Sequence, residues 1–197
     1  MNLIIITGIP CSGKTTISTI LSKTMHCDCI SKDLFKEQLF STYGFSSVEE
    51  KKHLDTQAEK LLYSTIAAYI EEGKDLIVDK WLQSTQPLQS IRNINNANLI
   101  FIRLITDPAI AVRRYNARMK SGKRPVSFMS LVQYPISNET TTCFEQPMVL
   151  DEMVEKANRE FHKEGMLNLL EIDTSNLEQE LDRIMNDVCN YVHKRMK

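Results

Sequence analysis

The sequence has almost no excess of charge, because 24 lysines and arginines stand against 25 aspartates and glutamates, giving a formal net charge of −1 over 197 residues. Global electrostatics therefore do not favour a polyanionic partner, and binding to nucleic acid would require a local basic patch. The sequence also lacks internal repeats and low-complexity segments. These features predict a single domain over residues 1–197, which is long enough to bury a hydrophobic core.

Cysteine is scarce and irregularly placed, with five residues in all. An odd number without framework-like spacing is typical of a reducing compartment. Cys27 and Cys29 are too close together for the usual zinc-knuckle spacing, and no histidine cluster completes a metal site. Apolar runs long enough to cross a bilayer are lacking, and the first apolar run has no basic segment before it. We therefore expect a cytoplasmic protein without a membrane partner.

Short apolar runs alternate with helical patterns along the chain. The runs are typical of buried strands and lie at residues 3–7, 28–30, 75–79, 99–105 and 169–172. Helical patterns lie at residues 14–25, 33–40, 47–72, from 107 onward and at 176–194. Strands separated by helices predict an α/β fold, a three-layer sandwich with a five-stranded parallel sheet.

Residues 8–15, with the sequence GIPCSGKT, fit the pattern G-x-x-x-x-G-K-[ST] without deviation, and they lie between a strand run and a helical pattern. The two glycines let the backbone wrap closely around phosphate oxygens, and the following helix directs the positive end of its dipole at them. Lys14 is suited to neutralise the β and γ phosphates, and the Thr15 hydroxyl is suited to ligate magnesium. We therefore predict a phosphate-binding loop (P-loop, or Walker A motif) that binds ATP with Mg²⁺. The residues predicted to bind the nucleotide are Gly8, Cys11, Ser12, Gly13, Lys14, Thr15 and Thr16.

Phosphoryl transfer to a hydroxyl also needs a carboxylate near the acceptor oxygen. Ligands of open α/β sheets lie beyond the carboxyl ends of the strands, which is where Asp33 and Asp79 fall in the predicted order. Asp33 is the candidate general base or metal organiser, although an acid in a first helical turn also complements the helix dipole. Asp79 is a candidate for holding magnesium or the acceptor, and equally for a strand-end acid that caps a turn. The sequence leaves open which of the two organises the metal.

A basic cluster follows the fourth predicted strand, and no acid interrupts it. Its members are Arg113, Arg114, Arg118, Lys120, Lys123 and Arg124. Arg114 and Arg118 share one helix face, where they could stabilise the charge that spreads over the transferred phosphoryl oxygens. A solvated helix end and a contact with a nucleic-acid backbone are the alternatives. Residues 121–148, which include three prolines, are predicted to form a mobile lid or acceptor insertion within the domain.

These motifs together resemble the small P-loop kinases with an adenylate-kinase-like core. The resemblance is closest to ATP-binding proteins related to polynucleotide 5′-kinase, chloramphenicol phosphotransferase and zeta toxins. It rests on the loop at 8–15, on the Ser31-Lys32-Asp33 step with Lys36, and on the arginines within 114–124, so that it covers most of residues 1–130 together with 171–175.

The resemblance implies that Asp33 would be the general base and that Lys36 would contact the acceptor. From the residues themselves, Arg118 and then Arg114 are the candidate catalytic arginines, and Asp79 and Arg124 are further candidates for contacting the acceptor. In polynucleotide kinases an arginine stands at the position of Lys36, and a lysine does not make the same bidentate contact. This difference disfavours a polynucleotide acceptor.

We therefore expect an ATP-dependent kinase that phosphorylates a hydroxyl of a small molecule. A polynucleotide 5′-hydroxyl kinase is one alternative, and it predicts that binding depends steeply on salt. A non-catalytic ATP-sensing module is another, and it predicts nucleotide binding without turnover. A GTPase is disfavoured because the sequence has no Asp-x-x-Gly after a strand and no Asn-Lys-x-Asp. A dinucleotide-binding protein is disfavoured because the loop is not G-x-G-x-x-G.

Overall fold

The computed structural model describes residues 1–83, 96–121, 133–135, 147–160 and 168–196. Five strands form one parallel sheet in the order β2-β3-β1-β4-β5, so the predicted five-stranded α/β fold is confirmed. The strands are β1 (Asn2–Gly8), β2 (Asp28–Ser31), β3 (Leu76–Asp79), β4 (Asn98–Ile105) and β5 (Leu169–Asp173). The helices are α1 (Lys14–Met25), α2 (Lys32–Tyr43), α3 (Val48–Glu71), α5 (Pro108–Lys120), α6 (Leu150–Asn158) and α7 (Leu177–His193).

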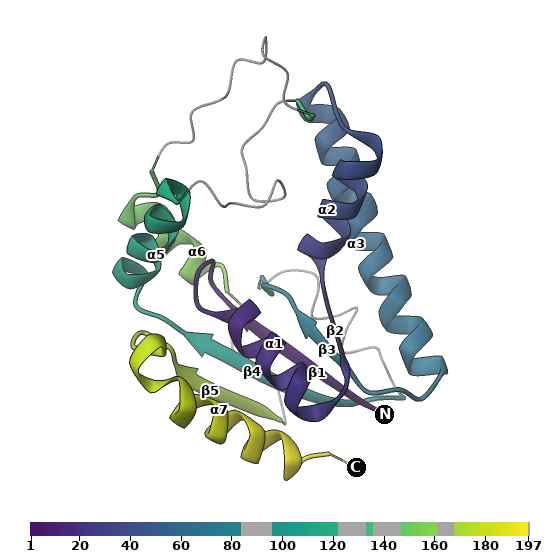
Figure 1. Cartoon of the computed structure of the whole chain (residues 1–197), viewed down its shortest axis with the longest axis vertical. Coiled ribbons are helices and arrows are strands. Elements are labelled where there is room, and N and C mark those ends of the chain that lie inside the picture. The colour runs from purple at the N-terminus through teal and green to yellow at the C-terminus, as the bar shows by residue number, and fades with distance from the viewer. Residues whose placement is uncertain (84–95, 122–132, 136–146, 161–167, 197) are drawn as a thin grey trace.

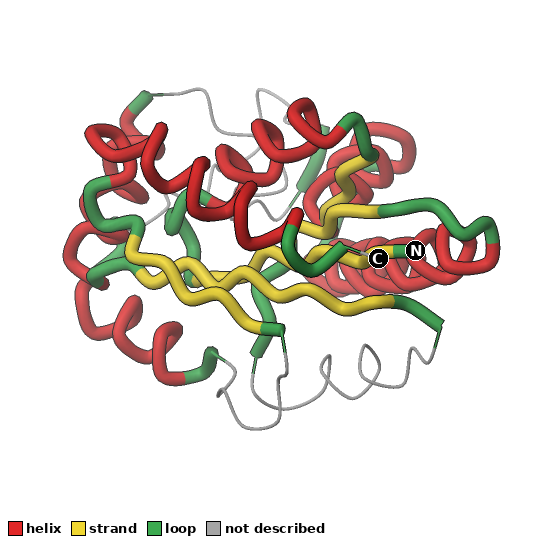
Figure 2. The backbone as a smooth tube through the Cα atoms, turned by 90° about the horizontal axis from the view of Figure 1, so that it is seen from below, coloured by secondary structure: helices red, strands yellow, loops and turns green. Residues whose placement is uncertain are grey.

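Strand β1 lies at the centre of the sheet, between β3 and β4, and all of its residues are buried. Its side chains alternate between two apolar layers. Ile4 and Ile6 belong to the layer that includes α1 and α7, whereas Leu3 and Ile5 belong to the layer that includes α3. Burial on both faces is the reason that the strands appear in the sequence as unbroken apolar runs. Seen from below, the strands run through the middle of the molecule with helices around them (Figure 2).

Two pairs of helices stand on either side of the loop that joins β1 to α1 (Figure 1). α2 and α3 form a hairpin, and Phe40, Phe45 and Leu54 pack together near its turn. α5 and α6 form the second pair, in which Met153 of α6 packs with Ala111 of α5 and with Ile9 of the loop. The sequence patterns do not predict α6. The loop is therefore flanked by helices from two distant parts of the chain.

The predicted lid at 121–148 lies outside the described residues, apart from residues 121, 133–135 and 147–148. Within it, Tyr134 and Phe45 exchange two backbone hydrogen bonds of 2.7 and 2.8 Å, and their rings stack with centroids 6.2 Å apart. The insertion therefore contacts the turn of the α2–α3 hairpin. No helix in the described part of the chain is long and apolar enough to cross a membrane.

Ile77 of β3 is 0% exposed and packs in the apolar layer between the sheet and α1. Truncation of its side chain should therefore destabilise the folded protein. Ile77→Ala removes buried methyl groups and leaves a cavity, and should lower the free energy of unfolding by about 2–5 kcal/mol in urea titrations. Leu61→Ala is the control, because Leu61 is 41% exposed on α3. Its effect should stay within about 0.5 kcal/mol. Equal losses in the two variants would contradict the assigned core.

Candidate active site

The loop at residues 8–15 has the backbone geometry of an anion-binding turn. Gly13 is in the left-handed region with φ 94°, and Cys11 is there too with φ 64°. A Cβ on Gly8 would lie 2.5 Å from the Ser12 hydroxyl and 2.8 Å from the carbonyl oxygen of Leu104 in β4. Only glycine therefore fits at this position. The loop ends at the N-terminus of α1, whose first backbone N–H groups have no partner within the helix.

The side chains of the loop are arranged as a phosphate site requires. The Lys14 ammonium donates to the carbonyl oxygens of Gly8 at 2.9 Å and Ile9 at 3.0 Å, across the concave side of the loop. Burial lowers the pKa of Lys14, against the opposing effect of nearby acids, chiefly Asp79. The Ser12 hydroxyl is fully buried and has no hydrogen-bond partner among the described residues. Cys11, Gly13, Lys14, Thr15 and Thr16 line the pocket, so the loop fits the phosphates of a nucleoside triphosphate.

Two oxygen ligands suited to magnesium lie side by side at the same loop. The Thr15 hydroxyl at the start of α1 donates to the Asp79 carboxylate at 2.8 Å. Asp79 ends β3 and is only 8% exposed, and its burial raises its pKa despite the charge of Lys14 and the bond from Thr15. A hydroxyl and a carboxylate beside a triphosphate are the donor set that Mg²⁺ uses, since the ion takes its other ligands from phosphates and water. These residues fit the metal.

Asp33 faces the phosphate loop from the first turn of α2. The helix begins where predicted, because the Ser31 hydroxyl accepts a hydrogen bond from the Leu34 N–H at 3.1 Å. Burial raises the pKa of Asp33, and the charges of Lys36 and Lys14 oppose that rise. A carboxylate with a raised pKa is a better proton acceptor than an exposed one.

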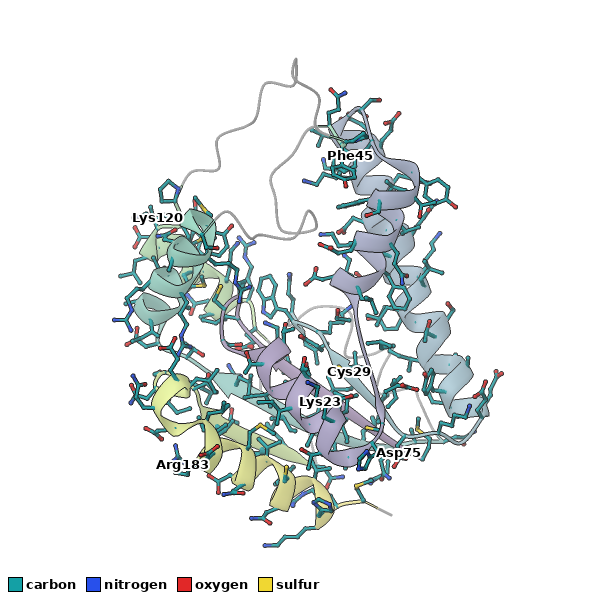
Figure 3. All side chains as sticks on the ribbon, viewed as in Figure 1. Lys23, Cys29, Phe45, Asp75, Lys120 and Arg183 are labelled. Carbon is teal, nitrogen blue, oxygen red and sulfur yellow. The ribbon has the colours of Figure 1, made fainter. Side chains whose placement is uncertain are left out.

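One pocket brings most of the predicted site residues together, between α2 on one side and α5 on the other. It is lined by Pro10, Cys11, Gly13, Lys14, Thr15, Thr16, Asp33, Asp79, Tyr115 and Arg118. Figure 3 shows the two pairs of helices that flank the pocket, with Phe45 at the turn of the α2–α3 hairpin and Lys120 at the end of α5. Asp107 caps α5 by accepting from the Ala109 N–H at 2.7 Å, and Tyr115 and Arg118 of this helix line the pocket.

The other predicted residues lie around this pocket. Gly8 and Ser12 belong to the same loop but are not among the residues that line the pocket. Arg114 donates to the carbonyl oxygens of Thr174 and Ser175 at 3.0 Å and more weakly to that of Cys11, so it ties the turn after β5 to the phosphate loop. A role for Arg114 in stabilising the transferred group stays a prediction. Lys36 forms an ion pair with Asp55 at 3.0 Å. Arg124 lies outside the described residues.

Three residues near the site were not indicated by the sequence patterns. Glu160 is 4% exposed and bonded to Arg103, and its charge, after that of Asp79, opposes the lowering of the pKa of Lys14 by burial. Tyr115 lines the pocket, and Trp81 follows β3 with a buried indole N–H that has no partner among the described residues. One feature of the sequence could have pointed to Trp81, which is its position two residues after Asp79 at the end of the predicted strand. No such feature points to Glu160, because it follows a segment without a recognisable motif.

The fold and this pocket define a class. A parallel sheet in the order β2-β3-β1-β4-β5 with a phosphate loop after β1 is the fold of small P-loop kinases. A candidate kinase from Chloroflexus aurantiacus shares it, with 25% identity, a TM-score of 0.75 and coverage of 99% of this chain and 97% of that one. A gluconokinase from Sinorhizobium meliloti is 10% identical, with a TM-score of 0.58 and coverage of 100% and 98%. A shikimate kinase from Aquifex aeolicus is 12% identical, with a TM-score of 0.53 and coverage of 97% and 96%.

The family follows from the sequence itself. The model of an AAA domain family matches residues 4–132, which include the phosphate loop, Asp33, Asp79 and the arginines of α5, and the chain belongs to that family. No curated protein matches the chain.

The close approach at Gly8 predicts the effect of adding one methyl group. Gly8→Ala must displace either Ser12 or the β4 backbone, and should weaken binding of a fluorescent ATP analogue by roughly tenfold or more, about 1.4 kcal/mol. Gly73→Ala is the matched control, because Gly73 also has a positive φ, 68°, but a Cβ there meets nothing within 4 Å. It should cost about 1 kcal/mol of stability and leave nucleotide affinity unchanged. Unchanged affinity in Gly8→Ala would mean that this loop does not hold the phosphates.

Proposed function

We propose that the protein is a magnesium-dependent ATP kinase that transfers the γ-phosphoryl group to a hydroxyl of a small molecule. The observation that carries this proposal is the presence of Asp33 in the same pocket as Lys14, Thr15 and Asp79. A phosphate loop alone supports nucleotide binding. A half-buried carboxylate that lines the same pocket from a separate helix supports activation of an acceptor as well.

The proposed reaction assigns each group one task. The loop amides and Lys14 hold the β and γ phosphates, after the Lys14 ammonium leaves the carbonyl oxygens of Gly8 and Ile9. Magnesium, when bound at Thr15 and Asp79, would neutralise phosphate charge. The acceptor oxygen forms a bond to the γ-phosphorus, the bond from that phosphorus to the β–γ bridging oxygen breaks, and ADP leaves. Asp33 takes the acceptor proton, and Arg118 stabilises the charge on the transferred oxygens.

A small acceptor is favoured by the lining of the described pocket between α2 and α5. Outside the phosphate loop, that lining contains a single basic side chain, Arg118, and so it is not an extended basic groove. The similar structures also include enzymes whose names specify small hydroxylated acids, gluconate and shikimate. Likeness at that level of identity supports the fold alone, so the acceptor itself rests on the pocket.

The role of Asp33 is tested by transfer from γ-labelled ATP with Mg²⁺ to a mixture of small hydroxylated metabolites and antibiotics and, separately, to a 5′-hydroxyl oligonucleotide. Asp33→Asn should lower transfer by about 10²–10⁴-fold, the usual contribution of a general base, while ATP binding persists. Asp182→Asn, an exposed acid on α7, is the control and should transfer at the wild-type rate. Label on the oligonucleotide alone would favour a polynucleotide kinase. ATP binding without any transfer would favour the ATP-sensing module.

The raised pKa of Asp33 predicts opposite effects on rate and stability. The base is lost as pH falls through its folded-state pKa, so the acid limb of kcat/KM should have its midpoint above the ordinary value of 3.8. Because that pKa is higher in the folded than in the unfolded state, the folded protein loses stability as pH rises through this interval. Asp33→Asn should therefore be more stable than wild type to urea at neutral pH, although it is inactive. A less stable variant would show that Asp33 serves the fold.

A further inference from the structure

Two side chains of α5 line the pocket, Tyr115 and Arg118, and the reaction proposed above gives a task to Arg118 alone. Tyr115 lies three residues before Arg118, so the two are neighbours on one face of the helix. It also lies one turn beyond Ala111, which is 0% exposed and packs with Ile9 of the phosphate loop. α5 stands beside that loop (Figure 1), and Tyr115 is therefore on the face of α5 that is turned toward it.

Polar contacts on either side of Tyr115 fix the rotation of α5 about its own axis. Arg114 donates to two carbonyl oxygens of the turn after β5, each at 3.0 Å. Asn116 accepts from the N–H of Met148 at 2.9 Å and donates to the Met148 carbonyl oxygen at 3.0 Å. Successive residues of a helix point about 100° apart, so these contacts hold α5 from two directions. The direction of Tyr115, which lies between them in the sequence, is set in the same way.

Tyr115 takes no part in the apolar packing that holds α5 in place. Apolar side chains join α5, α6 and the loop, and they are Ile9, Ala111 and Met153, with Val112, Met148 and Ala157 packed against them. Tyr115 is half-buried and is not a member of this cluster, as far as the described residues go. Its phenol therefore belongs to the wall of the pocket and not to the core.

Tyr115 reaches the pocket from the side opposite the proposed base. Asp33 enters from α2 and Tyr115 from α5, and the loop with Lys14 lies between the two helices (Figure 1). In the proposed reaction the γ-phosphoryl group moves from the phosphates held by Lys14 to an acceptor oxygen that Asp33 activates. Tyr115 therefore lines the space in which the transferred group would lie.

The transferred group needs hydrogen-bond donors on more than one side. Its charge spreads over three equatorial oxygens in the transition state, and donors that are already in place stabilise that charge. Outside the phosphate loop and α1, the lining of the described pocket consists of two carboxylates, Arg118 and Tyr115. An ionised carboxylate only accepts hydrogen bonds, whereas a phenol can donate one. Arg118 and Tyr115 are thus the two side-chain donors that α5 supplies.

We propose that Tyr115 is a further catalytic residue, whose hydroxyl donates a hydrogen bond to the γ-phosphoryl oxygens during transfer, beside Arg118. This inference rests on the proposed function, because it requires a phosphoryl group in transfer. The bond from the γ-phosphorus to the β–γ bridging oxygen breaks and the bond to the acceptor oxygen forms, as described above. The phenol keeps its proton throughout, and the proton of the acceptor passes to Asp33.

The experiment uses ADP with Mg²⁺ and aluminium fluoride, because this complex imitates the phosphoryl group in transfer and needs no identified acceptor. Calorimetry measures the affinity of the full chain for ADP, for a non-hydrolysable ATP analogue, and for ADP with aluminium fluoride. Tyr115→Phe removes the hydroxyl and keeps the ring. Tyr43→Phe is the matched control, because Tyr43 is 70% exposed at the end of α2. Arg118→Met shows the effect of removing the other donor of α5.

Tyr115→Phe should weaken binding of the aluminium fluoride complex roughly tenfold to a hundredfold, the range for a hydrogen bond to a charged group. Its affinities for ADP and for the ATP analogue should stay within about twofold of wild type, because the hydroxyl acts on the group in transfer. With γ-labelled ATP, kcat for transfer or hydrolysis should fall by a similar factor while KM for ATP is unchanged. Arg118→Met should show the same kind of loss, and Tyr43→Phe should show none.

Equal binding of the aluminium fluoride complex by wild type and Tyr115→Phe would overturn the inference. A loss shared equally by ADP and the ATP analogue would also overturn it, because Tyr115 would then support the loop rather than the transferred group. Failure of this inference is distinct from failure of the proposed function. Label on an acceptor at equal rates in wild type and Tyr115→Phe would leave the kinase intact and refute a catalytic Tyr115. A selective loss in Tyr115→Phe, with label released only to water, would support Tyr115 and refute the small-molecule acceptor.

Discussion

The site depends on one close contact, between the backbone of Gly8 at the end of β1 and the backbone of β4. β1 is the central, fully buried strand, and it pairs with β3 as far as Ile6 and with β4 as far as Gly8. A side chain at Gly8 would collide with the Leu104 carbonyl oxygen and with Ser12. Only this tight passage lets the chain turn into a loop whose amides face one point, ahead of α1. The apolar core thus fixes the position of the phosphate site.

The charges around that loop work against the stability of the fold. Burial raises the pKa of Asp33 and Asp79, and it lowers the pKa of Lys14. The three groups partly compensate one another. The charge of Lys14 opposes the rise in the pKa of both carboxyl groups, and the carboxylates oppose the fall in the pKa of Lys14. A bound nucleotide would offer the Lys14 ammonium phosphate oxygens in place of the carbonyl oxygens of Gly8 and Ile9. Sites of this kind are expected to store free energy that a ligand releases.

Helices on both sides of the loop contribute to the pocket. α5 brings Arg118 and Tyr115 to it, and Arg114 connects the turn after β5 to the loop. The α2–α3 hairpin brings Asp33, next to the ion pairs that Lys32 and Lys36 form with Asp55. Tyr134, which lies within the predicted insertion, contacts the hairpin at Phe45.

The sequence by itself determined the sheet, the loop and the candidate carboxylates, because each leaves a local pattern. Unbroken apolar runs marked the strands, Ser31 and Asp107 marked the starts of α2 and α5, and the spacing of two glycines with Lys14 marked the phosphate loop. The helix α6 left no such pattern. It has nine residues and no side-chain cap. Its buried residue, Met153, packs against Ile9 and Ala111, which are far away in the sequence.

Only the tertiary structure decided which distant groups meet. Lys32 and Lys36 of α2, Asp55 and Glu59 of α3, and Lys80 after β3 appear in the sequence as unrelated surface charges. Glu160 gains its place beside Arg103 because β4 and the end of α6 converge. Arg114 appeared in the sequence as one of a basic group, and the fold directs it to backbone carbonyl oxygens. Pairing over such separations depends on how helices pack on the sheet, and packing leaves no periodic trace in a single sequence.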